Sequence, residues 1–285
     1  ESVPFIVGAS DGVLANLGVA AVDPGSVACS VGTSGAVRTV VPKPVTDDKG
    51  RLFCYALTED HWVIGGPVNN GGIAFRWLRD HIFDDLTMEG IDPYDILNER
   101  AANVHPGAGG LLFLPYLTGE RAPFWNADMR SVFFGLNLNH TRNDMIRAVL
   151  EGVMFQLEMV VDVLKQSGVE PKEFRVTGGF TKSVLWPQIM ADIFEKEILV
   201  PEGISSACFG AALLAMKALG RLDDFKDIKN RVALRSHYLP NPSHVRIYRA
   251  YKPLFKRLAE TLQGEFSSIA VIQQKLANES PVREL

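Results

Sequence analysis

The sequence lacks the features that mark membrane-spanning, secreted or metal-bound proteins. It has no apolar run near twenty residues and no signal peptide at its start, so no transmembrane helix is expected. Its cysteines, Cys29, Cys54 and Cys208, are odd in number and far apart, which favours reduced thiols over a disulfide framework. The six histidines make no HExxH spacing and no CxxC occurs, so no metal site is expected. These absences predict a cytoplasmic protein with no membrane partner.

A block of basic residues and a Walker A sequence are missing as well. The formal net charge is −4, and the lysines and arginines are scattered, so nucleic acid is not an expected partner. Without a Walker A sequence, P-loop chemistry is excluded as the basis of any nucleotide binding.

The residues that are present predict an α/β domain with a mixed sheet flanked by helices. Hydrophobic residues make up 47% of the 285, enough for a large core. Strands are expected at 4–8, 27–30, 36–41, 52–57, 62–64, 111–114, 174–177 and 198–200. Helices are expected after Gly71-Gly72, from a capping box at Thr141, and over 185–194 and 207–219. The tail after Gln263 is polar, and we expect it to be loosely ordered.

Three glycine turns follow apolar strands, at 31–35, 70–72 and 178–181. Glycine has no Cβ, so each turn lets the backbone approach another group closely. The second and third turns also open helices, whose unpaired N–H groups and positive dipole end suit a phosphate. Each turn taken alone is better interpreted as an ordinary strand-to-helix connection.

Two charged residues are candidates for chemistry or binding. Asp11 follows the first expected strand, where its carboxylate can accept a proton from a substrate hydroxyl. The alternative, a simple Asp-Gly turn, is favoured when Asp11 is read alone. Arg121 lies in a long polar loop at 118–130 and either contacts an anion or pairs with Glu120 to tie the loop down. Of these two, the loop-tying pair is favoured.

Five segments, in this order, resemble the FGGY carbohydrate kinase family over residues 8–220. They are the turn around Asp11, the turn at 30–35, the stretch LLFLPYLTGERAPFW at 111–125, the segment from Ser131 to Glu151, and Gly178-Gly179 with the helix after it. Five matches in order are far more specific than any one alone. Within the family, the stretch at 53–72 is similar to bacterial gluconate kinases. The sequence departs from the family pattern at Arg130-Ser131, where many members have Arg-Gly.

The resemblance implies a fold of two actin-like (ribonuclease H-like) ATPase domains with the active site between them. Residues 1–12 would then be the last strand and catalytic turn of an N-terminal sugar-binding domain that lies before this chain. Residues 13–265 would be the C-terminal nucleotide-binding domain, and residues 266–285 a polar tail. The N-terminal domain of the same protein would be a partner, and it would carry most contacts to Mg2+. The sequence leaves a homodimer open.

The resemblance also implies a reaction and roles for particular residues. ATP would phosphorylate a sugar or sugar acid, with gluconate giving 6-phosphogluconate, and the isolated chain is expected to be inactive. The alternatives are a kinase for xylulose or another pentulose, and a non-catalytic actin-like module that binds nucleotide. Asp11 would be the catalytic base. The nucleotide would be bound by residues of the three glycine turns and of the helices they open: Gly32, Thr33, Gly72, Arg76, Gly178, Gly179 and Ser183.

Overall fold

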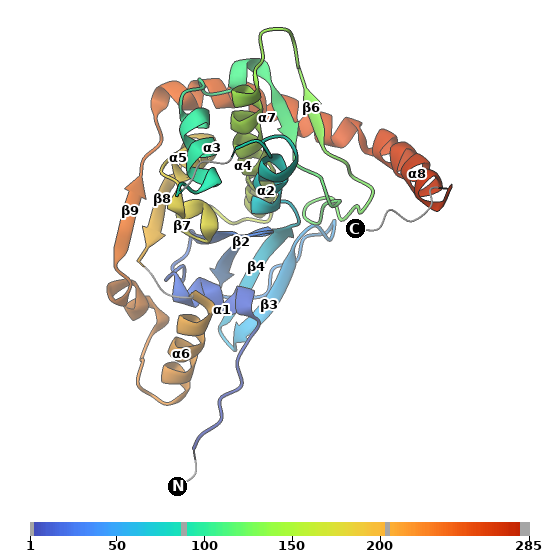
Figure 1. Ribbon diagram of the computed structural model, residues 1–285. Helices are drawn as coiled ribbons and strands as arrows, with labels where there is room; N and C mark the ends of the chain where they lie inside the picture. Colours follow the sequence, from blue (N-terminus) through green and yellow to red (C-terminus); the bar gives the residue numbers. More distant parts are fainter. Residues whose placement is uncertain (1–2, 87–89, 203–205, 280–285) are drawn as a thin grey trace.

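A seven-stranded mixed sheet forms the centre of the computed structural model, which describes residues 3–86, 90–202 and 206–279 (Figure 1). The strand order is β3-β4-β2-β1-β7-β8-β9, and β1, β7 and β8 run parallel while the other neighbours are antiparallel. Strands β5 (Leu112–Leu114) and β6 (Val132–Phe134) form a separate small ladder. The sheet strands are β1 (Ser26–Val31), β2 (Gly35–Val41), β3 (Phe53–Thr58), β4 (His61–Val68), β7 (Glu173–Thr177), β8 (Glu197–Pro201) and β9 (Leu234–Tyr238).

Helices cover both faces of this sheet (Figure 1). On one face, Val27, Cys29 and Val31 of β1 join a large core with the long helix α4 (Arg142–Gln166) and α5 (Leu185–Phe194). On the other face, Val40 and Val63 join a smaller core with α1 (Asp11–Gly18) and α6 (Ser206–Ala218). A sheet covered on both faces buries successive residues of its strands, and five of the six residues of β1 and five of the seven of β2 are buried. The predicted α/β class with a mixed sheet and flanking helices is confirmed.

The long helix α4 begins where the sequence predicts it. The Thr141 N–H donates to Asp144 Oδ2 at 2.7 Å, so the first turn is capped from within. Gly152, in the middle of α4, packs directly on β5, because a Cβ there would lie 2.1 Å from the Phe113 carbonyl oxygen. Glycine at this position therefore sets the distance between α4 and the small ladder.

Helices α1 and α6 also approach each other through glycines. A Cβ on Gly18 would lie 1.7 Å from the Ser206 carbonyl oxygen, and one on Gly210 would lie 1.9 Å from that of Leu14. The two backbones are therefore in direct contact, which fixes α1 and the residues at its start against the rest of the domain.

The prediction of a strand at 4–8 is wrong for the described part of the chain, which begins at residue 3. This segment is extended but joins no ladder, and the Phe5 side chain is 94% exposed. A strand needs a hydrogen-bonded neighbour, and none of the described residues pairs with this segment. Asp11 consequently begins helix α1 and does not end a strand. Residues 1–2 of the 1–12 segment assigned to the preceding domain lie outside the described residues.

The chain after residue 220 contains more regular structure than the sequence predicts. Helices α7 (Pro242–Thr261) and α8 (Gln263–Glu279) follow strand β9, so the prediction of a loosely ordered tail is wrong for residues 263–279. Helix α8 stays attached because Phe266 and Ala270 are buried, although most of its other side chains are exposed. Residues 280–285 of the predicted tail lie outside the described residues.

The other predicted elements match the observed ranges to within about two residues, except that strand β4 is longer than the three residues predicted for it. Helix α1, helix α3 (Pro93–Ala102) and strand β6 were not predicted. Helix α2 (Gly72–His81) opens at the predicted glycine pair. None of the helices in the described part of the chain has both the length and the apolar run needed to cross a bilayer.

The glycine at 152 gives a stability test. Gly152→Ala should lower the free energy of unfolding by about 1–3 kcal/mol, because its methyl group would collide with the backbone of β5. Gly264→Ala is the matched control, since a Cβ there meets open space and alanine favours a helix. Urea unfolding of both variants measures the effect. Equal stability of Gly152→Ala and the original protein would show that α4 does not need this close contact.

Candidate functional site

A hollow of about 420 Å³ lies where β1 and β7 end, between α2, α3 and the turn before α5. We call it the glycine-turn hollow, because residues of all three glycine turns or of the helices they open line it. Six of the seven predicted nucleotide-binding residues are among its lining: Gly32, Thr33, Gly72, Arg76, Gly179 and Ser183. Its volume lies in the range of small-molecule sites. The parallel pairing of β1 with β7, Ser30 opposite Thr177, brings these segments together across nearly 150 residues of sequence.

The first turn connects β1 to β2 through Gly32, Thr33 and Ser34. The Gly32 N–H donates to the Ser34 carbonyl oxygen at 2.9 Å, so this amide is already used within the turn. Thr33 lies exposed at the tip, and its hydroxyl has no hydrogen-bond partner among the described residues. The expected phosphate contact by the Gly32 N–H is therefore not supported, whereas the Thr33 hydroxyl is available.

The second turn is held against the first by backbone hydrogen bonds. The N–H groups of Gly71 and Gly72 donate to the carbonyl oxygens of Thr33 and Gly32 at 3.1 and 2.6 Å. A Cβ on Gly72 would lie 2.7 Å from the Gly32 oxygen, so only glycine permits this approach. The amides at the start of α2 are thus bonded inside the protein, which corrects the expectation that they are free for a phosphate. Gly72 instead fixes α2, and with it Arg76, beside the hollow.

The third turn needs glycine for both conformation and space. Gly178 has φ +115°, and a Cβ there would lie 2.2 Å from the Val31 carbonyl oxygen. Gly178 does not line the glycine-turn hollow; it lines a neighbouring hollow of about 630 Å³ on the other side of the turn. Gly179 and Lys182 line both hollows, and a Cβ on Gly179 would meet nothing within 4 Å.

Ser183 connects two helices at the rim of the glycine-turn hollow. Its Oγ accepts hydrogen bonds from the Leu185 and Trp186 N–H groups at 3.2 and 3.3 Å, which caps the start of α5. The same hydroxyl donates to Asn98 Oδ1 of α3 at 2.9 Å. Ser183 therefore shapes the site, and its hydroxyl is already engaged.

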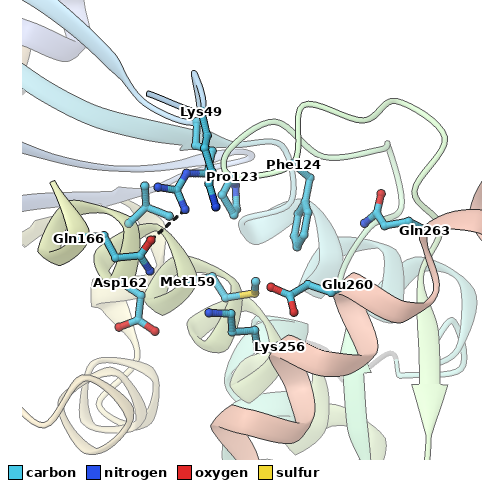
Figure 2. A pocket seen from close by; sticks show the side chains of 11 residues that line it. Lys49, Pro123, Phe124, Met159, Asp162, Gln166, Lys256, Glu260 and Gln263 are labelled. Atoms are coloured by element: carbon cyan, nitrogen blue, oxygen red, sulfur yellow. Dashed lines mark hydrogen bonds between the residues drawn. The ribbon is translucent and has the colours of Figure 1, made fainter. Parts of the chain in front are cut away.

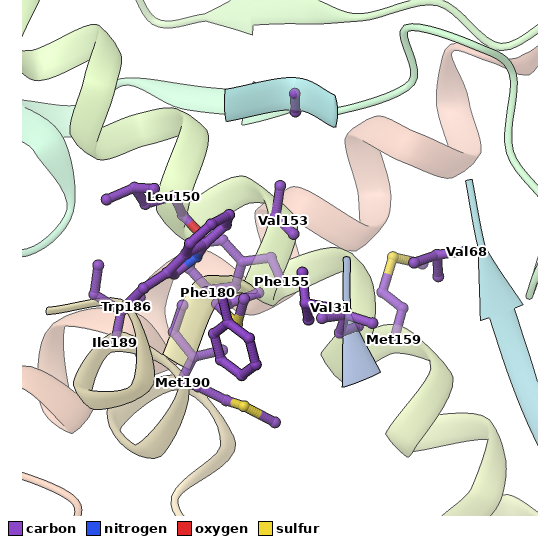
Figure 3. Packing of buried hydrophobic residues seen from close by; sticks show 14 of the residues in the cluster. Val31, Val68, Leu150, Val153, Phe155, Met159, Phe180, Trp186, Ile189 and Met190 are labelled. Carbon is purple, nitrogen blue, oxygen red and sulfur yellow. The ribbon is translucent and has the colours of Figure 1, made fainter. Parts of the chain in front are cut away.

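Aromatic rings form the floor of the glycine-turn hollow. The Phe75 ring lies 5.2 Å from that of Tyr94 and 5.5 Å from that of Trp186, and Phe180 lies 5.9 Å from Trp186, measured between centroids. Figure 3 shows Trp186 and Phe180 packed beside Leu150 and Val153 of α4. The Trp186 Nε1–H donates to the buried Leu150 carbonyl oxygen at 3.1 Å. The floor is thus a rigid apolar surface that suits a flat ring.

Charged and polar groups surround this floor. Arg76 and Lys182 are exposed cations, whereas Asp92 and Asp95 supply negative charge from the start of α3. The sequence reasoning missed the α3 contribution, which consists of Asp92, Tyr94, Asp95 and Asn98. A signal was present: Asp92 precedes Pro93, and its Oδ1 accepts a hydrogen bond from the Tyr94 N–H at 2.9 Å, as a residue before a helix-starting proline commonly does.

Asp11 lies outside the glycine-turn hollow. It is the exposed first residue of α1, and its Oδ1 accepts a hydrogen bond from the Gly12 N–H at 2.7 Å. Helix α1 covers the sheet face opposite α4, so Asp11 and the aromatic floor belong to different sides of the sheet. The structure therefore brings the nucleotide candidates together and keeps the candidate base apart from them.

Arg121 and Glu120 tie the long loop to the end of β4. Arg121 Nε donates to Asn69 Oδ1 at 2.7 Å, and its Nη2 donates to the Val68 carbonyl oxygen at 3.0 Å. The buried Glu120 accepts from the Asn70 side-chain amide at 3.1 Å, and burial raises the pKa of its carboxyl group. The two residues do tie the loop, but each bonds to β4 and its end, and no ion pair joins their side chains among the described residues.

A further hollow of about 400 Å³ lies away from these residues (Figure 2). It is bordered by Lys49 and Phe124 from loops and by Lys256 and Glu260 from α7, and none of the predicted site residues lines it. Among residues 3–86, 90–202 and 206–279, no group of three or more His, Cys, Asp or Glu is placed to hold a metal ion.

Comparison with known proteins agrees with this arrangement. Residues 27–219 match the C-terminal domain of the FGGY family of carbohydrate kinases. Gluconokinase from Bacillus licheniformis is 49% identical over 280 residues, which cover 96% of this chain and 55% of that protein.

Two solved structures from Lactobacillus acidophilus share the fold. A ligand-bound xylulose kinase has a TM-score of 0.86 and 39% identity, covering 93% of this chain and 53% of the other. A gluconate kinase has a TM-score of 0.85 and 38% identity, and the match covers 92% of this chain and 52% of the other. The chain thus spans about half the length of these relatives, and the predicted actin-like fold is confirmed. The match over residues 27–219 and the 49% identity to a gluconokinase show that the chain belongs to the FGGY family of carbohydrate kinases.

Proposed function

We propose that this chain is the nucleotide-binding half of an ATP-dependent gluconate kinase, which converts gluconate to 6-phosphogluconate. The observation that carries the proposal is the glycine-turn hollow, where residues predicted from three separate segments meet. Gluconate is favoured as the acceptor because a gluconokinase matches 96% of this chain at 49% identity.

The glycine-turn hollow has the chemistry that an adenine nucleotide requires. The aromatic floor of Phe75, Phe180 and Trp186 offers an apolar surface to a purine ring. The free hydroxyl of Thr33 can donate to a phosphate oxygen, and Arg76 and Lys182 add positive charge. ATP, when bound, supplies the phosphoryl group that is transferred.

Asp11 is proposed as the base that accepts the proton of the acceptor hydroxyl. Its carboxylate is exposed and bonds, among the described residues, to the neighbouring Gly12 N–H, so it is accessible to a substrate. In phosphoryl transfer such a carboxylate mainly orients the attacking hydroxyl. The negative charge of Asp11 also lies at the positive end of helix α1, where it is favourable.

The other half of the enzyme is part of the same proposal. A sugar-binding domain would precede this chain, residues 1–12 would complete it, and residues 13–265 would form the nucleotide-binding domain. Mg2+ would be held mainly by that preceding domain. The unpaired Cys29, Cys54 and Cys208 suit the reducing cytoplasm, where we place the enzyme.

A xylulose kinase is the second candidate, since a xylulose kinase structure is as similar to this chain as the gluconate kinase structure. Assays with gluconate and xylulose as acceptors separate the two. A non-catalytic nucleotide-binding module would need no acid at position 11, so a requirement for Asp11 separates it from both kinases.

The isolated chain should bind ATP or ADP weakly, with a Kd in the millimolar range, and should not phosphorylate gluconate. Calorimetry and a coupled assay for ADP release test the two parts. Arg76→Ala should weaken nucleotide binding by about 3- to 10-fold, since one charge-assisted contact is lost. Lys49→Ala, in the hollow of Figure 2, is the control and should leave binding unchanged. Robust turnover by the isolated chain would contradict the proposed division into two halves.

Thr33 can be tested in the two-domain enzyme, meaning this chain together with the sugar-binding half proposed to precede it. Thr33→Val removes the hydroxyl but keeps the shape, so transition-state stabilisation should fall by about 1.5–3 kcal/mol. Steady-state kinetics should show a higher KM for ATP and a lower kcat, whereas Thr33→Ser should behave like the original enzyme. If valine leaves the ATP dependence unchanged, Thr33 is only a turn residue.

Asp11→Asn in the same two-domain enzyme should lower turnover by about 10²- to 10⁴-fold, because the amide cannot accept the proton. Asn also favours turns, so nucleotide affinity and thermal stability should stay close to the original values. Turnover is measured with gluconate and ATP both saturating. Asp48→Asn changes an exposed loop carboxylate and should have no effect. Activity of Asp11→Asn within a few-fold of the original would remove Asp11 as the base.

A further inference from the structure

Arg38 of strand β2 points to the sheet face that Asp11 and helix α1 occupy. Side chains alternate along a strand, and Val37 joins the core under α4 whereas Val40 joins the core with α1 and α6. Arg38 is on the Val40 side. Its cross-strand neighbours, Ala28 on β1 and Gly65 on β4, are both small. A Cβ on Gly65 would lie 2.9 Å from Arg38 Cγ, so the glycine leaves room for the arginine stem.

The guanidinium of Arg38 reaches the start of helix α1. A Cβ on Gly12, the residue after Asp11, would lie 3.1 Å from Arg38 Nε. The Nη2 group donates to Ser30 Oγ at 3.3 Å, a long hydrogen bond. The Nη1 group is buried and has no hydrogen-bond partner among the described residues, and no carboxylate there forms an ion pair with Arg38.

Arg38 is therefore a half-buried cation whose Nη1 group is enclosed and unpaired, an arrangement that is costly unless an anion completes it. Burial is the main cause that lowers the pKa of Arg38; the nearby positive charge of Arg121 lowers it further, and Asp11 acts in the opposite direction.

The position of Arg38 favours the acceptor over the nucleotide as the source of such an anion. Arg38 is absent from the lining of the glycine-turn hollow, whose aromatic floor lies in the core on the α4 side of the sheet. It lies instead beside Gly12 in the first turn of α1, next to the proposed base Asp11. A guanidinium with one free and one weakly bonded nitrogen suits bidentate binding of a carboxylate.

We propose that Arg38 binds the carboxylate of the acceptor, an aldonic acid, and so selects sugar acids over neutral sugars. The inference rests on the proposed function, because Asp11 marks where the acceptor lies. It assigns to this chain a substrate-binding residue in addition to its nucleotide site.

The test compares gluconate with sorbitol, which has the same hydroxyl chain but a neutral end. In the two-domain enzyme, Arg38→Met keeps much of the apolar stem and removes the charge. The KM for gluconate should rise about 10- to 100-fold, the usual loss for a charge-assisted hydrogen bond, with the KM for ATP unchanged. Sorbitol, measured as a substrate or as a competitive inhibitor, should bind no more weakly than before. Arg76→Met is the matched control, because it should raise the KM for ATP and leave the KM for gluconate unchanged.

The outcomes separate this inference from the function on which it rests. An original enzyme that does not phosphorylate gluconate overturns the proposed function, and the role of Arg38 with it. If the enzyme is active and Arg38→Met leaves the KM for gluconate unchanged, only the role of Arg38 is overturned. Equal weakening of gluconate and sorbitol binding would also overturn it, since Arg38 would then not recognise the carboxylate. A change confined to kcat or to the KM for ATP would do the same, because Arg38 would then contact the phosphoryl group or the preceding domain.

A second variant keeps the test decisive if Arg38→Met does not fold, as judged by loss of its thermal transition. Arg38→Lys retains the charge, so it should fold, but it cannot form the bidentate contact of a guanidinium. It should raise the KM for gluconate by about 3- to 10-fold and leave sorbitol binding unchanged. A loss shared equally by gluconate and sorbitol in this variant would overturn the proposal.

Discussion

Direct backbone contact between the first glycine turn and the other two organises this domain. The parallel pairing of β1 and β7 places Gly178 against the Val31 carbonyl oxygen, where a Cβ would lie only 2.2 Å away. Gly72 meets the Gly32 carbonyl oxygen in the same manner, and its N–H donates to that oxygen at 2.6 Å. Any side chain at these positions would push α2 and the turn before α5 outward. The glycine-turn hollow exists because its walls come together in this way.

The same contacts explain why few backbone amides are left to bind a phosphate. The carbonyl oxygens of Gly32 and Thr33 accept the first N–H groups of α2, and Ser183 caps the first N–H groups of α5. Satisfying these groups makes the site rigid, since each unpaired buried group would cost free energy. The groups that stay available to a ligand include the Thr33 hydroxyl, the exposed cations and the aromatic floor.

The sheet itself separates two chemical neighbourhoods. Its α4 face carries the aromatic floor, held by Trp186 and the core around it (Figure 3), and its α1 face carries Asp11 and Arg38. The alternation of side chains along β1 and β2 assigns neighbouring residues to opposite faces. The two faces of a single strand pair therefore carry different groups, an apolar aromatic floor on one side and charged side chains on the other.

The sequence by itself determined the glycine positions, the capped start of α4, the mixed α/β class and the family. These follow from local properties, because missing Cβ atoms, capping side chains and apolar periodicity act within a few residues. It also gave six residues of the hollow, through the order of motifs along the chain.

Only the tertiary structure decided which groups are free. Whether the Gly32 N–H or the Ser183 hydroxyl is available depends on partners in distant segments, and the α3 residues reach the hollow only because β1 and β7 pair. The extended segment at 3–8 illustrates the same limit, since its apolar pattern suits a strand but a strand forms only beside a hydrogen-bonding neighbour. Hydrogen bonding and burial are long-range properties, and a local pattern cannot specify the partner that satisfies them.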